Sequence, residues 1–492
     1  MKQPWPCGPQ TCRSSADFAL TAAEGLWLRF AGKFNPFQAN DACRPQRPDA
    51  VDPAPRTASR LCPALQLALG LIIGTAILPQ PGFSQEIPDA IASEPAEPVS
   101  TIESKLDAEL RFRTAASGGI TAPAPGQDDW RRGASDRVRL GAQLRRQNIS
   151  SYVQLQQSGA LGDAGPGDQP LQFGMQQGFV RVEEAGLRGL RVDFGRMALE
   201  YGSARMIGRY DFHETGNAFD GLRAHQTVGD YLDADVLAVK IRRNSAHPDK
   251  GRNLFGLYAT ARPTSRVTAD LYLLYLSDTT ETAQSHDITM GSRIEFRPWS
   301  FLTAEAELAA QIGGEQLADH AQARDHLALA MAGSLQLDAS KWIPLYGRAF
   351  SHMYSGDELA HPNVSSRWHP LYPSLDEIVG FLQIFAQANL TQVGGTLGWK
   401  PVEKIDISLD GRQSYARTGT TLPGFAGQIL PGDGAWVRLG AELDLRIRWS
   451  LRPWSQLLLV GGSFAPSQDV KSNLLNQGRN ISQVLLQWTT RF

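Results

Sequence analysis

The last twelve residues of the chain, Ile481 to Phe492 (ISQVLLQWTTRF), alternate between apolar and polar side chains. Because successive side chains of a strand point to opposite faces, Val484, Leu486 and Trp488 share one face. The other face carries Gln483, Gln487, Thr489 and Arg491. A membrane-spanning strand needs about 9 to 11 residues that are apolar toward lipid and polar toward the lumen. The segment predicts the closing strand of a transmembrane barrel, although a soluble sheet with one wet face is the alternative.

Similar alternating segments recur from residue 105 to the end, with no long stretch of helical periodicity. Several are joined by very short turns that contain proline, at 262–265, 297–300, 400–403 and 452–455. Proline suits a turn, and Trp299 and Trp454 suit the aromatic girdle of a membrane interface. Since longer polar stretches alternate with these turns, we favour short periplasmic turns and long extracellular loops over unrelated hairpins.

The strand count also predicts one helix. Short turns on one side of a barrel require an even number of strands between them, which leaves one surplus segment between 297 and 400. Ser374 and Glu377 match a capping box, and Ile378, Phe381 and Phe385 follow helical spacing. We therefore predict a short helix at 374–390, within an extracellular loop over 351–390. The remaining segments predict an all-β fold, a transmembrane antiparallel barrel of about 18 strands with both termini in the periplasm.

Composition is compatible with this fold. The net charge of −2 does not favour nucleic-acid binding, and the mean hydropathy of −0.27 does not favour a helical membrane protein. All four cysteines, the last of them Cys62, precede the predicted strands. The barrel region therefore offers no disulfide, no cysteine nucleophile and no cysteine metal ligand.

The first hundred residues divide into three predicted segments. Residues 51–84 contain the apolar run 61–78 after two arginines and before small residues, which is typical of a secretory signal peptide. A single membrane anchor is the alternative. Residues 1–50 are interpreted as a non-translated or unstructured extension, and residues 85–104, rich in Pro, Ala and Glu, as a flexible periplasmic lead. The barrel is expected over residues 105–492.

Alternation also assigns side chains to the lumen. In the segment 436–449, Val437 and Leu439 fall on the lipid side, and Arg438, Arg446 and Arg448 on the lumen side. The arginines assigned to the lumen or its mouth are Arg111, Arg113, Arg137, Arg139, Arg145, Arg196, Arg205, Arg223, Arg242, Arg293, Arg348, Arg412, Arg438, Arg446 and Arg448. Guanidinium binds carboxylate through two parallel hydrogen bonds, so this lining predicts a path for carboxylated or phosphorylated solutes. The alternative is that the arginines pair with acidic side chains of the wall.

The stretch Phe194 to Arg223 (FGRMALEYGSARMIGRYDFHETGNAFDGLR) resembles the signature region of the alginate-export family of outer-membrane barrels. The matching positions are Gly195, Arg196, Tyr201, Gly202, Arg205, Gly208, Asp211, Phe219, Asp220, Gly221 and Arg223. Two positions depart from the pattern, because Ser203 and Phe212 stand where Asp and Trp are expected. Both lie in a predicted loop, so they bear on the substrate more than on the fold.

The resemblance implies an 18-stranded barrel that passively exports an anionic polysaccharide, alginate or a similar polyuronate. Expected partners are that polymer, outer-membrane lipid and periplasmic exopolysaccharide machinery, without nucleic acid. The motif residues Arg205, Asp211, Asp220 and Arg223 are also expected to form an internal charge network that pins the loop over the mouth. We expect either this structural role or substrate binding.

Two other classes of function compete with polymer export. A porin specific for small anionic or aromatic solutes is the main alternative. Catalysis would need Ser351, His352 and Asp357, but adjacent strand residues point to opposite faces, so we expect no enzyme. The remaining histidines, including His213, His361 and His369, lack metal-ligand spacing, and we expect neither a metal nor a cofactor.

Overall fold

The computed structural model describes residues 102–119, 130–161, 172–243, 251–280, 283–317, 323–357, 363–419, 430, 432–471 and 478–492. The predicted extension, the signal peptide region and nearly all of the predicted lead segment lie outside these residues. No helix among the described residues is long and apolar enough to cross a membrane.

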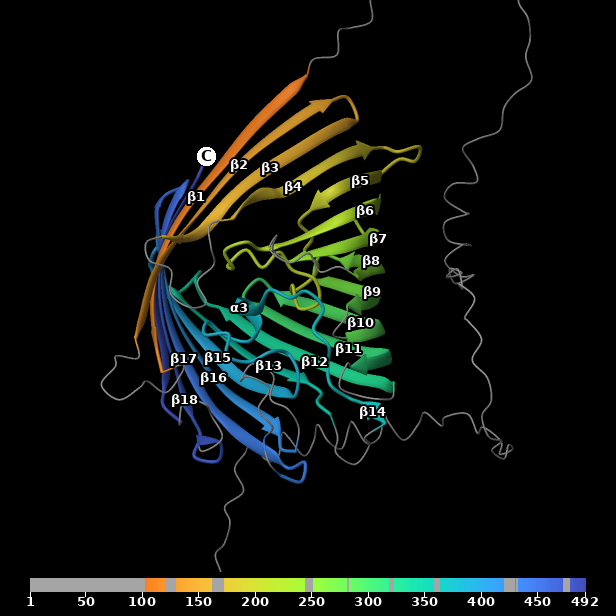
Figure 1. The fold of residues 1–492 in the computed structure, drawn as a ribbon. Helices are drawn as coiled ribbons and strands as arrows, with labels where there is room; N and C mark the ends of the chain where they lie inside the picture. Colours follow the sequence, from red (N-terminus) through yellow and green to blue (C-terminus); the bar gives the residue numbers. More distant parts are fainter. Residues whose placement is uncertain are drawn as a thin grey trace, which may run out of the picture. The chain divides into compact units, whose positions relative to one another are not determined.

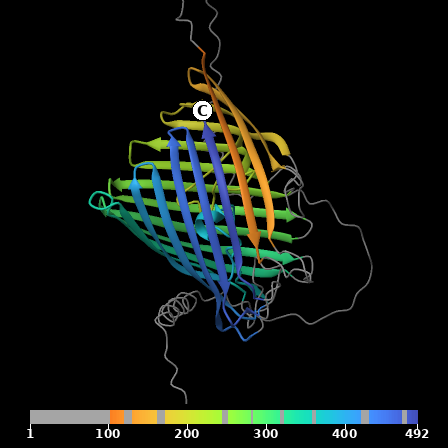
Figure 2. The same ribbon diagram turned by 90° about the vertical axis from the view of Figure 1, so that its left-hand side faces the viewer.

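The described part forms one closed antiparallel barrel, because β1 pairs with both β2 and β19 (Figures 1 and 2). The predicted 18 wall strands are confirmed; a nineteenth strand, the two-residue β14, pairs in parallel with β12. The strands are β1 (Glu103–Gly118), β2 (Arg131–Arg146), β3 (Ile149–Leu161), β4 (Gln172–Glu183), β5 (Leu190–Met197), β6 (Asn217–Val228), β7 (Leu232–Arg243), β8 (Arg252–Thr264), β9 (Val267–Thr280), β10 (Ala283–Trp299), β11 (Leu302–Leu317), β12 (Arg324–Asp338), β13 (Leu345–Tyr354), β14 (Val364–Ser365), β15 (Leu390–Val402), β16 (Ile405–Arg417), β17 (Trp436–Arg452), β18 (Ser455–Pro466) and β19 (Ile481–Arg491).

Alternation gives the wall an apolar outer face. In β19, Val484, Leu486 and Trp488 are exposed, as predicted from the closing segment. Trp488 stacks on Phe112 of β1, with ring centroids 6.3 Å apart, across the seam that Figure 2 shows between the first and the last wall strand. The outer face therefore suits lipid along the closing strands as elsewhere.

The two ends of the barrel differ. One end, the short-turn end, carries the turns between β8 and β9, β10 and β11, β15 and β16, and β17 and β18. Exposed aromatic side chains crowd this end, as expected for an interfacial girdle; they include Trp299, Trp342, Trp399, Trp454 and Phe492. The opposite end, the long-loop end, carries the longer connections between strands. Two of these connections fold back into the barrel.

The predicted helix at 374–390 is wrong in extent, because only α3 (Leu375–Ile378) is helical. Ser374 does not take part in the predicted capping box. Its side chain makes no hydrogen bond that caps α3 and instead accepts one from the backbone N–H of Tyr210 (3.0 Å). Strand β13 also continues to Tyr354, beyond the predicted strand end at 350. The helical spacing of Phe381 and Phe385 reflects their burial inside the barrel instead.

Two segments fill the interior at the long-loop end. The first inserted loop, residues 198–216, joins β5 to β6; the second inserted loop is described over residues 363–389 and leads into β15. They pair with each other, since the Gly208 N–H donates to the Tyr372 carbonyl and the Tyr372 N–H to the Met206 carbonyl, both at 2.8 Å. Figure 1 shows α3, part of the second loop, within the ring of strands.

An apolar core holds the two loops against one side of the wall. Ile207, Trp368 and Tyr372 of the loops belong to one buried cluster with inward side chains of the wall. The wall members on β6 to β9 include Phe219, Leu237, Val239, Ile241, Leu254, Tyr258, Tyr272 and Leu274. Alternation alone suggested a uniformly polar lumen. The structure differs, because part of the lumen is a packed apolar core.

Candidate functional site in the barrel lumen

The first inserted loop is clamped by guanidinium groups of β1 and β2. Arg111 and Arg137 donate to the backbone carbonyl of Asp211 at 2.8 and 2.9 Å. The same two side chains donate to the His213 carbonyl at 3.1 and 3.2 Å. Four hydrogen bonds from two guanidinium groups therefore converge on one short stretch of loop backbone, which fixes its path along the wall.

The carboxylates of this loop reinforce the clamp. Asp211 pairs with Arg139 at 2.6 Å, and Glu214 pairs with Arg111 and Arg113 at 2.7 and 2.8 Å. Burial acts to raise the pKa of Asp211 and of Glu214, but the adjacent guanidinium groups outweigh it and lower the pKa of both. The loop therefore carries its negative charges into the clamp at neutral pH.

A second contact fixes the beginning of the same loop. Arg205 donates to Glu305 and Glu307 of β11, each at 2.7 Å, and Ser203 donates to Glu307 at 2.9 Å. The serine at the position where the family pattern has Asp thus supplies a donor. An aspartate there would place a further carboxylate beside Glu307.

The second inserted loop is held by acceptors of the wall. The backbone N–H groups of Leu382 and Phe381 donate to Glu442 and Asp444 of β17, at 3.1 and 3.3 Å. Arg412 of β16 donates to the Ile378 carbonyl at 3.3 Å. Glu442 and Asp444 are both buried, and one oxygen of each has no hydrogen-bond partner among the described residues.

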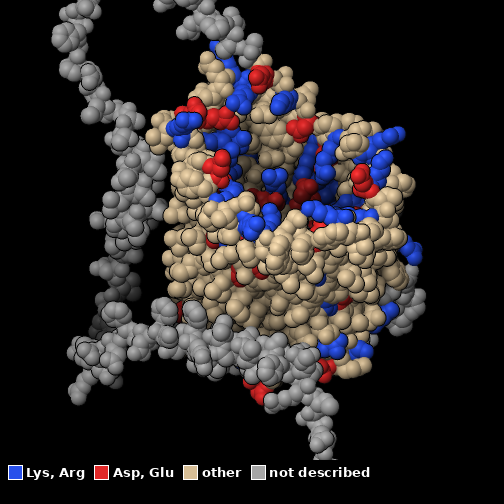
Figure 3. All heavy atoms as spheres, turned by 180° about the vertical axis from the view of Figure 1, so that it is seen from behind, with Lys and Arg blue, Asp and Glu red and all other residues tan. Residues whose placement is uncertain are grey.

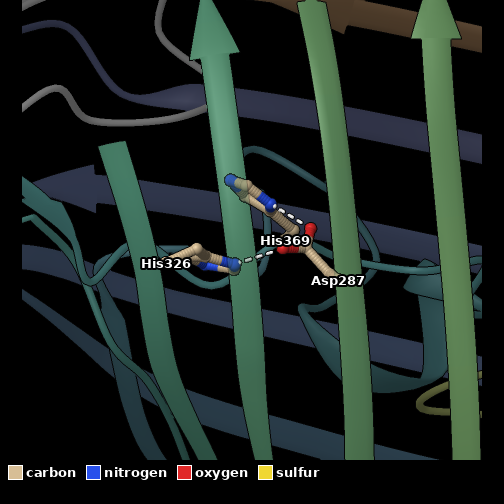
Figure 4. Close-up of side chains that lie close together, drawn as sticks. All are labelled: Asp287, His326 and His369. Atoms are coloured by element: carbon tan, nitrogen blue, oxygen red, sulfur yellow. Dashed lines mark hydrogen bonds and ion pairs between the residues drawn. The ribbon is translucent and has the colours of Figure 1, made fainter. Parts of the chain in front are cut away.

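The same loop also contacts β10 and β11 through His369. Its Nδ1 lies 2.8 Å from Asp287 of β10 and its Nε2 lies 3.1 Å from Glu315 of β11. His326 of β12 also contacts Asp287 (Figure 4). Sequence reasoning missed this cluster because its members come from three strands and a loop; the inward parity of Asp287 and His326 was the available signal.

At two positions of the signature region the backbone requires glycine. Gly195 and Gly221 face each other across β5 and β6, with φ of 128° and 155°. A Cβ would lie 2.3 Å from the Gly178 carbonyl oxygen in the first case and 2.2 Å from that of Ala238 in the second. Only glycine fits at the base of the first inserted loop.

The predicted internal network of Arg205, Asp211, Asp220 and Arg223 does not exist as one unit. Arg223 pairs with Asp235 on β7 at 2.6 Å, apart from the contacts of Arg205 and Asp211 given above. Asp220 pairs with Arg196 at 2.6 Å. Their sequence neighbours Phe219 and Met197 are buried in the interior cluster, so the Arg196–Asp220 pair lies on the outer side of the wall. The assignment of Arg196 to the lumen is therefore wrong.

Tyr201 and Gly202 of the first inserted loop lie against Tyr258 of β8. The Tyr201 ring stacks on Tyr258 with centroids 4.5 Å apart, and the Arg223 guanidinium lies 5.7 Å from its centroid. Gly202 has φ of 54°, and a Cβ on it would lie 2.6 Å from the Tyr258 hydroxyl. Both motif residues therefore pack the loop against the wall.

The assignment of Arg438 to the lumen is wrong. The register of β16 and β17 shifts between Ser414 and Tyr415, and Gly440 has φ of 154°, which marks a bulge. The bulge reverses the alternation, so Leu439 joins the interior cluster and Arg438 is exposed. The side chain of Arg242 lies outside the described residues.

The other arginines of β4 to β12 that face inward are engaged by acidic neighbours. Arg293, for example, contacts Asp270 and Glu305, each at 2.8 Å. Near the short-turn end, Arg145 pairs with Glu183 at 2.6 Å, with 45% of the Arg145 side chain exposed. Pairing within the wall, the alternative to an anion-binding lining, thus accounts for many of the predicted residues.

Basic side chains also lie on the inner face of β13, β15 and β17, toward the short-turn end; this basic wall comprises Arg348, Lys400, Arg446 and Arg448. Arg446 makes no hydrogen bond or ion pair within the described part of the chain, and Arg448 lies 3.8 Å from Asp406. Lys400 lies over the Tyr346 ring, 5.0 Å from its centroid. Figure 3 shows basic side chains gathered around a hollow in one face, with acidic ones among them.

The residues weighed for catalysis are separated. His352 is buried on the inner face, whereas Ser351 is exposed on the opposite face of β13. Asp357 accepts hydrogen bonds from Ser365 and from the Ser366 N–H. Of the other histidines, His213 contacts Thr215 in the first inserted loop, and His361 lies outside the described residues.

Comparison with solved structures gives the same architecture. The fold is similar to OccAB3 of Acinetobacter baumannii (TM-score 0.56, 9% identity, covering 79% of this chain and 99% of that one). It is also similar to OccK10 (OpdN) of Pseudomonas aeruginosa (TM-score 0.54, 11% identity, covering 79% and 99%) and to OccK11 (OpdR) of the same organism (0.53, 11%, 79% and 96%). At these identities the likeness concerns the fold alone.

Sequence comparison identifies the family. No curated protein sequence matches the chain significantly. The model of the family described as alginate export, however, matches residues 108–474, which include both inserted loops and most of the wall. Family and fold together place the protein in the bacterial outer membrane as a solute channel, and the chain belongs to the alginate export family.

Proposed function

We propose that the protein passively conducts anionic solutes, and that its substrate is a carboxylated exopolysaccharide of the alginate kind. The observation that carries the proposal is the basic wall. Three of its four members are guanidinium groups, which bind carboxylates in planar, two-point geometry. Because the wall is near the short-turn end, expected in the periplasm, it is the first inner surface that an outgoing polymer from periplasmic machinery meets.

A second candidate is a porin for small anionic or aromatic solutes. The observation that favours it is the packed core between the two inserted loops and β6 to β9, which leaves less of the lumen for a polymer. The two functions differ in whether a polyuronate chain can enter past these loops.

Single-channel recording of the refolded mature chain in planar bilayers tests the proposal. We expect an anion-selective pore that short polyuronate oligomers block from the short-turn side. The substitutions Arg446→Ala and Arg448→Ala should weaken both anion selectivity and block. Arg438→Ala is the matched control, since this arginine of the same strand is exposed outside the lumen and its loss should change neither.

The possible outcomes separate the candidates. An anion-selective pore that polyuronate does not block would support the small-solute porin. A cation-selective pore, or equal effects of Arg438→Ala and Arg446→Ala, would contradict the role of the basic wall.

A further inference from the structure

Asp287, His326 and His369 meet in a buried cluster near the long-loop end. They come from β10, β12 and the second inserted loop, and one ligand-type atom from each lies within 4.8 Å of the others. Asp287 and His326 are almost completely buried, and the side chain of His369 is 22% exposed. Figure 4 shows both rings directed at the two oxygens of one carboxylate.

Without a bound cation, this cluster has more hydrogen-bond acceptors than N–H donors. His326 Nδ1 lies 2.6 Å from Asp287 Oδ1, and its Nε2 lies 2.8 Å from the Arg367 carbonyl. His369 Nδ1 lies 2.8 Å from Asp287 Oδ2, and its Nε2 lies 3.1 Å from Glu315 Oε2. All four ring nitrogens face acceptors, but a neutral imidazole has only one N–H.

With Asp287 and Glu315 ionised, protons alone would satisfy these contacts only if both rings were imidazolium ions. The rings are stacked, with centroids 4.1 Å apart and planes 23° from parallel. Two like charges at this separation in a buried site repel each other strongly. A single cation between the rings and the carboxylate would remove the need for the second proton on each ring.

We propose that Asp287, His326 and His369 bind one divalent transition-metal ion of the Zn²⁺ class. The Nδ1 atoms of the two histidines and a carboxylate oxygen would be the ligands. Each ring then keeps its proton on Nε2 and donates it outward, His326 to the Arg367 carbonyl and His369 to Glu315. Donation of the second ring nitrogen to a carbonyl or carboxylate is the usual support of a metal-bound histidine.

The donor set and the space agree with this class of metal. Two imidazoles and one carboxylate suit Zn²⁺ and its neighbours and are a poor set for Ca²⁺ or Mg²⁺, which prefer oxygen ligands. Metal–ligand distances of about 2.0–2.2 Å require the nitrogen and oxygen atoms to separate by a few tenths of an ångström beyond their present 2.6 and 2.8 Å. The loop residue His369 can provide the movement at the 2.8 Å contact, and a side-chain rotation of Asp287 or His326 can provide it at the 2.6 Å contact.

The backbone around His369 is prepared for such a role. Gln311 of β11 accepts from the His369 N–H at 2.9 Å and donates to its carbonyl at 2.7 Å. A metal bound here would join β10 and β12 to the second inserted loop. The site would thus fix the position of that loop in the lumen, independently of which solute the channel conducts.

Titration of the metal-stripped, folded full-length protein with Co²⁺ tests the proposal. We expect one equivalent to produce a visible absorption band, and an equal amount of Zn²⁺ to abolish it. His369→Ala and Asp287→Asn should each remove the band or weaken affinity by at least roughly 100-fold, and Glu315→Gln should weaken it by about 10- to 100-fold. His369 lies on a loop, so its substitution spares the wall, and barrel folding is checked by circular dichroism.

His286→Gln is the control, because His286 adjoins Asp287 in β10 but is exposed. Its titration should match the wild type. Absence of a Co²⁺ band in the wild type up to millimolar metal would overturn the proposal. A band that survives both His369→Ala and Asp287→Asn would overturn it as well, since the metal would then bind elsewhere.

Discussion

The two inserted loops are held in the same lumen by opposite chemistry. The first brings carboxylates and carbonyls to guanidinium groups of β1 and β2, whereas the second brings backbone N–H groups to carboxylates of β17. Every charge in the first set has an opposite partner. In the second set, Glu442 and Asp444 each keep an oxygen without a partner in the described structure.

This difference separates a contact that depends on ionic charge from one that depends on hydrogen-bond acceptors alone. Removing a charged partner from the first loop leaves a buried ion uncompensated, which is strongly destabilising. The second loop needs acceptors at the positions of Glu442 and Asp444, but nothing in its own backbone requires them to be ionised. Four experiments can test this contrast.

The largest effect is expected for Arg137→Met. Arg137 is 1% exposed and contacts Glu109 and Asp211, so its loss should cost about 3–5 kcal/mol. Hydrogen exchange measured by mass spectrometry should show faster exchange over 209–216 than over 378–384. The control Arg145→Met removes a largely exposed pair and should cost at most about 1 kcal/mol. Equal acceleration in the two loops would show that they do not differ in the proposed way.

A smaller effect is expected for glycines of the strands that flank the two loops. Gly221→Ala should destabilise the protein by about 1–3 kcal/mol, because the new Cβ meets the Ala238 carbonyl at a φ of 155°. Gly395→Ala, within β15, the strand that follows the second loop, meets only the Arg348 carbonyl at 3.1 Å and has no positive φ, so its cost should be lower. Denaturant unfolding of the two variants measures the difference, and a costlier Gly395→Ala would contradict it.

Acid should release the first loop. The pKa values of Asp211 and Glu214 are lowered from ordinary values of 3.8 and 4.5. Their stabilisation is therefore complete above about pH 4.5 and is lost as pH falls through the lowered values. Single-channel noise recorded from pH 7 to pH 3 should rise only below about pH 4.5. The double variant Asp211→Asn, Glu214→Gln should show this noise already at pH 7.

The smallest effect is expected for Glu442→Gln. The amide carbonyl can still accept from the Leu382 N–H, so the hydrogen bond that holds the second inserted loop is kept. We expect a stability change within about 1 kcal/mol of zero. Thermal unfolding followed by circular dichroism measures it, with Glu442→Ala, which removes the acceptor, as the comparison. A large loss in Glu442→Gln would mean that the ionised carboxylate is required.

The wall could be predicted from the sequence because alternation is a local property. All 18 segments read from alternation correspond to strands, and the turns near Trp299 and Trp454 fall at one end. The errors arose where tertiary contacts override the local pattern. Ser374 binds the other loop instead of capping a helix, and the bulge near Gly440 reverses the facing of Arg438.

The lumen was less predictable for a different reason. Parity states which side a residue faces but not what fills the space in front of it. The arginines of β1 and β2 do face inward, yet they bind a loop whose return into the barrel has no local signal. The contact of His369 with Asp287 spans 82 positions of sequence, which no spacing rule for metal ligands covers.

The seam between β1 and β19 has a consequence for how the molecule folds. Arg491 donates to Glu109 across 382 positions, whereas most neighbouring wall strands are joined by hairpins. Loop-closure entropy grows by about 0.6 kcal/mol for each doubling of length, so this pairing costs about 3 kcal/mol more than closing a twelve-residue hairpin. Hairpins should therefore form early and the seam late, which leaves β1 and β19 as open edges during assembly.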